Sequence, residues 1–231
     1  MLSKEILDIL RESREDGWVV EPRAKRILSL TGLAVPRFAW ARELEEALAF
    51  VKERGYPVVA KIVSPRVIHK SDAAGVVTNI DSDEALKETF SRFSGFDGFS
   101  GILVEEMVEG VELIIGAKVD YQFGPVVLLG IGGTGVEIYR DIALRMAPLE
   151  PRDVEFMVRS LRARSLLEGY RGSRPVNVQD LSRMMVAFSN LAMELEGHIT
   201  SIDLNPVMCS PEGCIVADAR IMLAGDEPAD H

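Results

Sequence analysis

The segment YPVVAKIVSPRVIHKSDAAGVVTNI, residues 56–80, combines two apolar, strand-like runs with a polar loop between them. The loop carries His69 beside Lys70 and Ser71, and His69 is one of only three histidines in the chain. His198 follows a predicted helix end, where the helix dipole is sufficient to explain it, and His231 is terminal. We expect a strand–loop–strand unit in which His69 is either an ordinary loop residue or the reactive group.

Lys61 stands inside the first apolar run, between Ala60 and Ile62. Burying an unpaired ammonium group is costly, so a lysine at this position needs an explanation. One explanation is an edge strand, from which the long side chain reaches water. The other is a cation directed at a phosphate group from the end of a strand.

Helices and strands alternate in the first part of the chain, and strands dominate the second. The predicted helices cover residues 3–15, 21–32, 42–55, 83–93, 151–168 and 177–196, with Asp81-Ser82 as a cap for the fourth. After the Gly-rich stretch SGFDGFSG, the predicted strands cover residues 102–108, 111–120, 124–131, 136–146, 199–208 and 214–223. This arrangement is typical of an α+β protein with a subdomain boundary near residues 94–101.

Four glycines occur within six residues in GIGGTGVE (130–137). Glycine lets backbone N–H groups approach an anion closely, so this stretch could line a phosphate group. It matches neither the dinucleotide fingerprint nor a Walker loop, because no Lys-Ser/Thr follows and the next segment is strand-like. A plain hairpin turn is the alternative.

Oxygen-bearing side chains gather in the two arms of the predicted C-terminal hairpin, SIDLNP (201–206) and VADAR (216–220). Asp203 and Asn205 are two residues apart and therefore point to the same side of a strand, which Asp218 on the return arm can approach. Oxygen ligands from paired strands suit Mg²⁺, which keeps nucleotide phosphates and water among its ligands. A hairpin with solvated acids is the alternative.

The segment VEEMVEG (104–110) joins the two parts of the chain. A strand that leads into a linker offers free backbone groups for the edge of a purine, although plain connecting loops are common. Glu112, in GVELIIG, is a further acid inside an apolar strand.

Composition restricts the class of partner. The net charge of −10 argues against nucleic acid and anionic membranes, because both require a basic surface. No apolar run approaches the roughly 18 residues that a membrane span needs, so we expect a cytoplasmic protein.

Cys209 and Cys214 flank the turn sequence Ser-Pro-Glu-Gly and could face each other across a hairpin. Without an export signal, two free buried thiols are expected rather than a disulfide.

Taken in order, these features resemble a known family. Lys61, VIHKSDAAGVV, ILVEEMVEGVELIIGAKVD, GIGGTGVE, DLNP and VADAR follow one another as in the ATP-grasp nucleotide-binding (β) subunit of ADP-forming acetyl-CoA synthetases, relatives of succinyl-CoA synthetase. The resemblance implies an ATP-grasp fold with two α+β subdomains that close over the nucleotide. It divides the chain into an N-terminal helical extension (1–17), a first subdomain with Lys61 and the His69 loop (18–100), a second subdomain (101–225) and a tail (226–231).

The resemblance also implies roles for single residues. The residues expected to bind ATP or ADP are Lys61, Lys70, Glu105, Val108, Glu112, Gly132 and Gly133. Among them, the lysines would contact phosphate groups, Glu105 and Val108 would lie near adenine, and Glu112 would reach the ribose or phosphate region. Asn205 and Asp218 would bind Mg²⁺, whereas Asp203 stands where related enzymes often have Glu.

His69 would be the second phosphohistidine of a relay. In the family's scheme, a separate CoA-binding α subunit makes acyl phosphate, a histidine there takes the phosphoryl group, and a mobile element carries it to His69, which passes it to ADP. The net reaction is acyl-CoA + ADP + phosphate to acid + CoA + ATP. A neutral imidazole nitrogen is a competent nucleophile near pH 7. The chain contains no CoA-binding unit, so the resemblance implies an α2β2 heterotetramer.

Two other functions fit parts of the same pattern. A stand-alone ATP-grasp ligase would activate a carboxylate directly as acyl phosphate and would need no phosphohistidine. A non-catalytic nucleotide-sensing module would bind ATP and form no phosphoprotein. The behaviour of His69 distinguishes these hypotheses from the relay.

Overall fold

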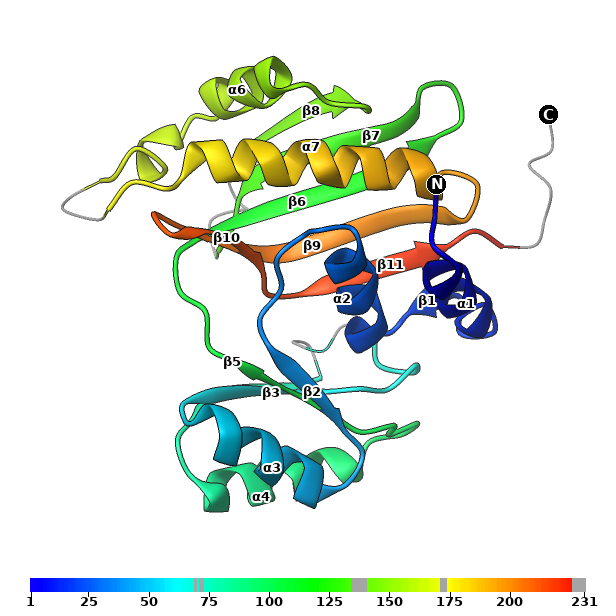
Figure 1. Cartoon of the computed structure of the whole chain (residues 1–231), viewed down its shortest axis with the longest axis vertical. Helices are drawn as coiled ribbons and strands as arrows, with labels where there is room; N and C mark the ends of the chain where they lie inside the picture. The colour runs from blue at the N-terminus through cyan, green and yellow to red at the C-terminus, as the bar shows by residue number, and fades with distance from the viewer. Residues whose placement is uncertain (69, 71–72, 134–140, 171–173, 226–231) are drawn as a thin grey trace. The chain divides into compact units, whose positions relative to one another are not determined.

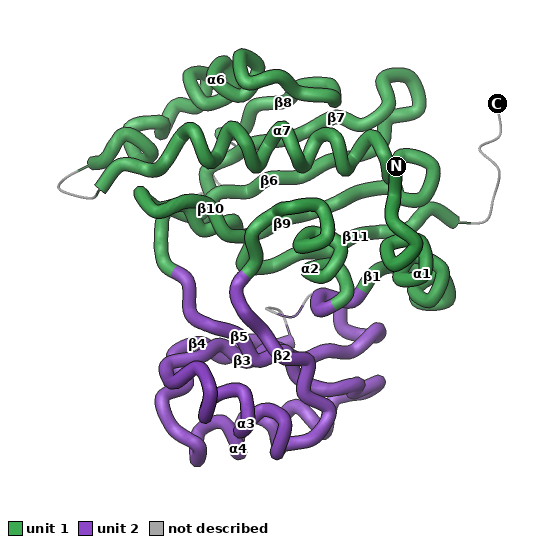
Figure 2. The backbone as a smooth tube through the Cα atoms, in the orientation of Figure 1, with its two compact units in different colours: residues 1–19, 23–35, 109–231 green, residues 20–22, 36–108 purple. Residues whose placement is uncertain are grey.

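The computed structural model describes residues 1–68, 70, 73–133, 141–170 and 174–225. The chain divides into two compact units: unit 1 comprises residues 1–19, 23–35 and 109–231, and unit 2 comprises residues 20–22 and 36–108 (Figure 2). These limits differ from the predicted boundaries after residues 17 and 100. The reason is that helix 21–30 packs mainly in unit 1, while the strand 102–106 pairs inside unit 2.

Unit 2 is a four-stranded antiparallel sheet with two helices packed against one face. Its strands are β2 (Phe38–Ala41), β3 (Val58–Ile62), β4 (Val76–Ile80) and β5 (Ile102–Glu106), in the order β2-β5-β3-β4. The helices are α3 (Leu44–Arg54) and α4 (Asp83–Ser94) (Figure 1). The predicted cap of α4 is confirmed, because the Ser82 side chain accepts a hydrogen bond from the Ala85 N–H. Alternate residues of β3 and β5 face the helices, among them Ala60, Ile62 and Val104.

Unit 1 is built around a larger antiparallel sheet. Its strands are β1 (Trp18–Val19), β6 (Val111–Asp120), β7 (Gly124–Ile131), β8 (Ile142–Met146), β9 (Ile199–Ser210), β10 (Gly213–Val216) and β11 (Ala219–Leu223). The order is β1-β11-β9-β6-β7-β8, and β10 pairs with β9. The helical segments are α1 (Lys4–Glu12), α2 (Glu21–Leu30), α6 (Pro151–Ser160), the short 3-10 segment η1 (Arg164–Leu166) and α7 (Val178–Leu195).

The long helix α7 runs along one face of this sheet and covers its apolar side (Figure 1). Along β6, Leu113, Ile115 and Ala117 are buried in the core, whereas Glu112 and Lys118 are exposed on the opposite face. The period of two therefore separates a core face from a polar face, which carries the candidate metal residues of β9.

Most predicted elements are confirmed, but the helix predicted over 151–168 is wrong. Helix α6 ends at Ser160, and Leu161 is extended (φ −68°, ψ 133°) and buried. The Asp141 carboxylate accepts hydrogen bonds from the N–H groups of Arg162 and Ala163, both at 2.8 Å. These hydrogen bonds replace those that would continue α6, and helical structure resumes only as the short η1 turn.

The C-terminal hairpin is also more divided than expected. The return arm consists of β10 and β11, which both pair with β9 and are separated by Ala217 and Asp218. Cys209 and Cys214 are cross-strand partners, and the prediction of two free buried thiols is confirmed. Of the strand predicted over 136–146, residues 136–140 lie outside the described residues.

Candidate nucleotide and phosphoryl-transfer site

Lys61 lies at the centre of a buried ionic cluster in unit 2. It belongs to β3, but its side chain projects from the face of the sheet opposite to α3 and α4. The Lys61 ammonium lies 2.9 Å from a carboxylate oxygen of Glu21 and 2.7 Å from one of Glu105. The lysine is therefore not an edge residue that reaches water, as one interpretation of the sequence held. It is 5% exposed and paired inside the protein.

Lys70 joins the same cluster through Glu21. Its ammonium contacts the second oxygen of the Glu21 carboxylate, and its side chain is buried. The Lys70 carbonyl accepts a hydrogen bond from the Gly75 N–H at 2.7 Å, and a side chain at Gly75 would collide with Ile62. Lys70 is thus held by both its side chain and its backbone. Its neighbour His69, the predicted phosphohistidine, lies outside the described residues.

The four groups named here are two lysines and two glutamates, so their formal charges balance. Buried ammonium and carboxylate groups persist when each has an opposite charge and hydrogen bonds, as these do. Two ammonium groups on one carboxylate are also of the type that binds phosphate oxygens. The structure therefore brings Lys61, Lys70 and Glu105 together, with both lysines paired to carboxylates.

Val108 follows β5 at the end of unit 2 and is half-buried. Glu105 precedes it by three residues and points into the ionic cluster, with its carboxylate on Lys61. The Glu105 carboxylate is therefore paired with Lys61 inside unit 2.

In unit 1 the glycine stretch lies against Glu112. The Gly132 N–H donates to the Glu112 carbonyl at 2.6 Å, and a Cβ at Gly132 would lie 2.8 Å from that carbonyl. Gly133 has φ of +83°, and a Cβ there would lie 3.4 Å from a Glu112 carboxylate oxygen. Glycine is required at position 132 by the close approach and favoured at position 133 by the left-handed backbone. Residues 134–137 of the stretch GIGGTGVE lie outside the described residues.

Asn205 and Asp218 lie next to each other on the polar face of unit 1. The Asn205 N–H donates to the Asp218 carbonyl at 3.2 Å, so the two backbones are directly paired. Asn205 is exposed and Asp218 is half-buried, which leaves side-chain oxygens within reach of solvent. Asp203, two residues earlier, is placed differently, because the Arg220 guanidinium lies 3.2 Å from its carboxylate.

These oxygens fit a magnesium ion better than a metal that needs a full protein shell. Among the residues the structure describes, no group of three or more His, Cys, Asp or Glu side chains could hold a metal ion. Mg²⁺ is usually held by one or two carboxylates together with substrate phosphates and water. One amide on β9 and one carboxylate in the connection between β10 and β11 match that requirement.

Comparison with known proteins identifies the family. The model of the ATP-grasp domain family matches residues 10–223. The chain belongs to the ATP-grasp family. It is 42% identical to the acetate–CoA ligase (ADP-forming) I subunit beta of Pyrococcus furiosus, over 96% of this chain and 97% of that one, which places it in the family of these beta subunits. The predicted α+β, ATP-grasp fold is confirmed.

Two further relatives show the range of the family. Acetate–CoA ligase (ADP-forming) I of Archaeoglobus fulgidus is 37% identical over 97% of this chain, which corresponds to 33% of that longer protein. A solved chain of an acetyl-coenzyme A synthetase from Ca. Korarchaeum cryptofilum is 39% identical, with a TM-score of 0.83 and coverage of 95% and 100% of the two chains. That structure holds coenzyme A and Mg-AMPPCP, with a phosphohistidine segment pointing towards the nucleotide binding site.

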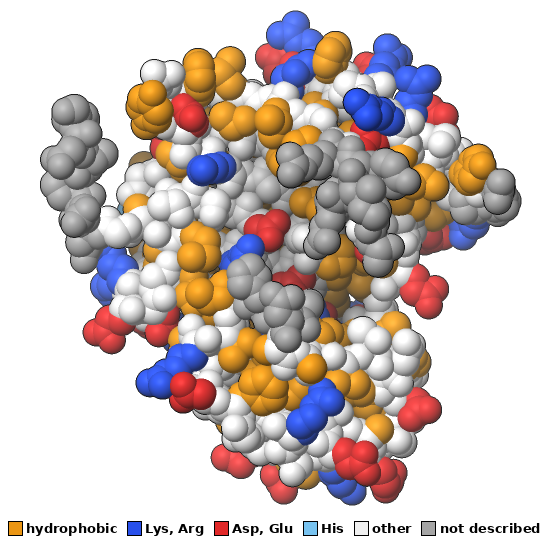
Figure 3. Space-filling view, turned by 180° about the vertical axis from the view of Figure 1, so that it is seen from behind, with side chains coloured by type: hydrophobic (Ala, Val, Ile, Leu, Met, Phe, Trp, Pro, Cys, Tyr) orange, Lys and Arg blue, Asp and Glu red, His pale blue; other side chains and the backbone are white. Residues whose placement is uncertain are grey.

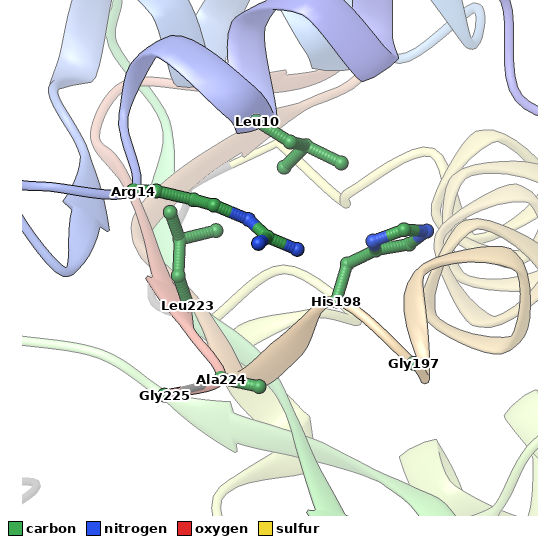
Figure 4. A pocket seen from close by; sticks show the side chains of 7 residues that line it. All are labelled: Leu10, Arg14, Gly197, His198, Leu223, Ala224 and Gly225. Atoms are coloured by element: carbon green, nitrogen blue, oxygen red, sulfur yellow. The ribbon is translucent and has the colours of Figure 1, made fainter. Parts of the chain in front are cut away.

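The ATP-grasp chain has a separate small pocket in unit 1, shown in Figure 4. It has a volume of about 60 Å³ and is lined by Leu10, Arg14, Gly197, His198, Leu223, Ala224 and Gly225. The Arg14 and His198 side chains point into it from opposite sides (Figure 4). Within the described chain, none of the predicted site residues lines this pocket. His198 follows α7, as predicted, and its N–H donates to the Leu195 carbonyl at 2.8 Å.

The surface of the ATP-grasp chain mixes both signs of charge. On the face seen in Figure 3, Lys and Arg side chains stand singly or in small groups among acidic, apolar and neutral ones. In the part of the chain that the structure describes, no helix has both the length and the apolar character needed to cross a bilayer.

Sequence reasoning missed Glu21, although it bridges both lysines of the cluster. An acid in the first turn of a helix is ordinarily explained by the helix dipole, and Glu21 fits that explanation too. The sequence feature that could have indicated a buried Glu21 is its position directly after the apolar run Trp18-Val19-Val20. Lys25, one turn further along α2, is also fully buried and was likewise missed.

Proposed function

We propose that this chain is the nucleotide-binding, phosphoryl-transferring subunit of an ADP-forming acyl-CoA synthetase that acts on acetyl-CoA. The net reaction is acyl-CoA + ADP + phosphate to acid + CoA + ATP, and it is reversible. The observation that carries the proposal is the buried lysine pair, whose Lys70 directly follows His69, in a chain that matches a beta subunit over 97% of that subunit's length.

In this proposal His69 accepts and donates the phosphoryl group. An imidazole nitrogen attacks the phosphorus of the incoming phosphohistidine of the partner, the P–N bond to the partner breaks, and a P–N bond to His69 forms. A terminal phosphate oxygen of ADP then attacks the same phosphorus, which releases His69 and forms ATP. Positioning and electrostatic stabilisation do most of the work in such transfers, because charge spreads over the phosphoryl oxygens.

The chain's own charged groups meet that requirement. Lys61 and Lys70 take phosphate oxygens, and the backbone at Gly132 and Gly133 approaches the terminal phosphate. Asn205 and Asp218 hold Mg²⁺, which when bound neutralises negative charge on the phosphates. Glu105 and Val108 lie towards adenine, and Glu112 lies towards the ribose or the phosphates.

The proposal includes a CoA-binding α subunit as partner, in an assembly of two copies of each chain in the cytoplasm. It is supported by the longer Archaeoglobus fulgidus relative, in which the matching region is 33% of one chain. The remaining two thirds of such a protein are available for acyl-CoA chemistry, including the choice of acyl group.

The test combines the purified chain with a CoA-binding partner subunit, acetyl-CoA, ADP, phosphate and Mg²⁺, and measures ATP formation. We expect ATP from the complete mixture and none with His69→Ala. His198→Ala is the matched control, because that histidine lines the separate pocket of unit 1, and it should retain activity. Full activity of His69→Ala would favour the stand-alone ligase, and ATP binding with no turnover in any mixture would favour the sensing module.

A further inference from the structure

Glu21 contacts both lysines of the cluster with one carboxylate. One oxygen lies 2.9 Å from the Lys61 ammonium, and the other contacts the Lys70 ammonium. All three side chains are buried, at 3%, 5% and 9% exposure for Glu21, Lys61 and Lys70. We propose that Glu21 is a positioning residue for phosphoryl transfer, which holds the two lysines side by side and anchors the residue that follows His69. This inference rests on the proposed function.

Like charges at close range in a poorly solvated site repel strongly, so two buried ammonium groups need a carboxylate between them. Glu21 supplies it from a rigid support. It is the first residue of α2, where the positive end of the helix dipole favours a carboxylate, and Pro22 restricts the backbone directly after it. A side chain placed in this way holds its partners in one geometry, as a transfer site requires.

The anchor reaches the His69 segment through Lys70. The Lys70 side chain is fixed on Glu21, and the Lys70 carbonyl is fixed by the Gly75 N–H at 2.7 Å. These two attachments set the position of the residue directly after His69. Without the Glu21 carboxylate, the backbone attachment remains and the contact of the Lys70 ammonium with that carboxylate is lost. The expected defect is therefore in phosphoryl transfer rather than in nucleotide affinity.

The charge of the cluster allows a positioning role of Glu21 to be distinguished from a purely structural one, because the two roles predict different effects on ATP binding and on the rate. Glu21→Gln keeps the size of the side chain and leaves the lysines with one surplus positive charge. A surplus positive charge favours the nucleotide phosphates, so the half-saturating ATP concentration should stay the same or fall. The maximal rate should fall by about 10²-fold, the scale expected when a reacting group is displaced by roughly 1 Å.

The experiment is single-turnover labelling of the purified chain by γ-labelled Mg-ATP, with the labelling rate followed against ATP concentration. The matched control is Glu5→Gln, which removes an exposed carboxylate of α1 that is paired with Arg26 of α2 at 2.7 Å, and it should behave as wild type. A Glu21→Gln rate within about twofold of wild type would overturn the inference, as would an unchanged maximal rate with weakened ATP binding. If the wild-type chain takes no label, either alone or with the CoA-binding partner, the proposed function fails instead.

A second variant covers the case in which Glu21→Gln does not fold. The double variant Glu21→Gln/Lys70→Met removes one charge of each sign, so the cluster stays neutral and should fold. If Glu21 acts through Lys70, the double variant should label at the rate of Lys70→Met alone. A further fall of about 10²-fold in the double variant would show that Glu21 acts independently of Lys70, and would overturn the inference.

Discussion

Replacing Lys61 by Met removes the central cation of the cluster while keeping a long side chain on β3. The change leaves two buried carboxylates, Glu21 and Glu105, with one lysine, Lys70. Removing one partner of a buried ion pair typically destabilises a protein by about 3–5 kcal/mol, because the remaining charge is not compensated. Lys61 lies 2.9 and 2.7 Å from the two carboxylates, so we expect a loss within this range.

The two tryptophans allow the loss to be assigned to unit 2. Trp40 lies in β2, and its ring N–H donates to the Ser100 carbonyl at 2.9 Å, whereas Trp18 lies in β1 of unit 1. In a Trp18→Phe background, fluorescence therefore follows the unfolding of unit 2 alone. With a urea dependence of about 2 kcal/mol per molar, a loss of about 3–5 kcal/mol lowers the midpoint by about 1.5–2.5 M.

The charge-balanced variant Lys61→Met/Glu105→Gln is the control for this measurement. It removes one charge of each sign, so most of the lost midpoint should return even though two buried groups have changed. If Lys61→Met alone shifts the midpoint by less than about 0.3 M, or if the double variant is less stable than the single one, the ionic account of this cluster is wrong.

Three further predictions concern unit 1 and the metal. Asp218→Asn should weaken nucleotide binding in the presence of Mg²⁺ about tenfold in a titration with ATP, whereas exposed Asp97→Asn should not; equal affinities would contradict the metal assignment. Gly132→Ala should lower the free energy of unfolding by about 1–3 kcal/mol and weaken ATP binding, because its Cβ would lie 2.8 Å from the Glu112 carbonyl; Gly197→Ala, whose Cβ would meet nothing within 4 Å, should change ATP binding little. A hydrogen bond to Cys214, and then burial, raise the pKa of the Cys209 thiol above its ordinary value. Its neutral form therefore stabilises the fold below that ordinary value, and the contribution is lost as the pH rises; urea midpoints of wild type and Cys209→Ala should converge at alkaline pH, and parallel curves would contradict this.

Local patterns in the sequence were sufficient for most of the fold. The alternation along β6 separates buried Leu113, Ile115 and Ala117 from exposed Glu112, and Ser82 caps α4 as its position predicted. These features depend on residues a few positions apart. Asn205 and Asp218 are 13 positions apart, but the predicted hairpin brought its two arms, and with them these two residues, together.

Features that depend on distant residues were not predictable in this way. The bridge between Glu21 and Lys61 spans 40 positions, and the bond from Arg162 to Asp141 that ends α6 spans 21. Neither contact produces a periodic pattern in the sequence. A single acidic residue in a helix or loop is equally well explained as a residue exposed to solvent, so the sequence does not indicate its distant partner. The ion pair between Glu105 and Lys61 was likewise not predicted, because the two residues lie on different strands far apart in the sequence.

The central claim is that a phosphoryl group rests on His69, and it can be measured on the chain itself. The purified chain is incubated with γ-labelled ATP and Mg²⁺, with and without the CoA-binding partner, and the label is tested for acid lability and base stability. The account predicts an acid-labile, base-stable label on the wild-type chain and on His198→Ala, and none on His69→Ala. A wild-type chain that takes no label under either condition, or a label that persists in His69→Ala, would contradict it.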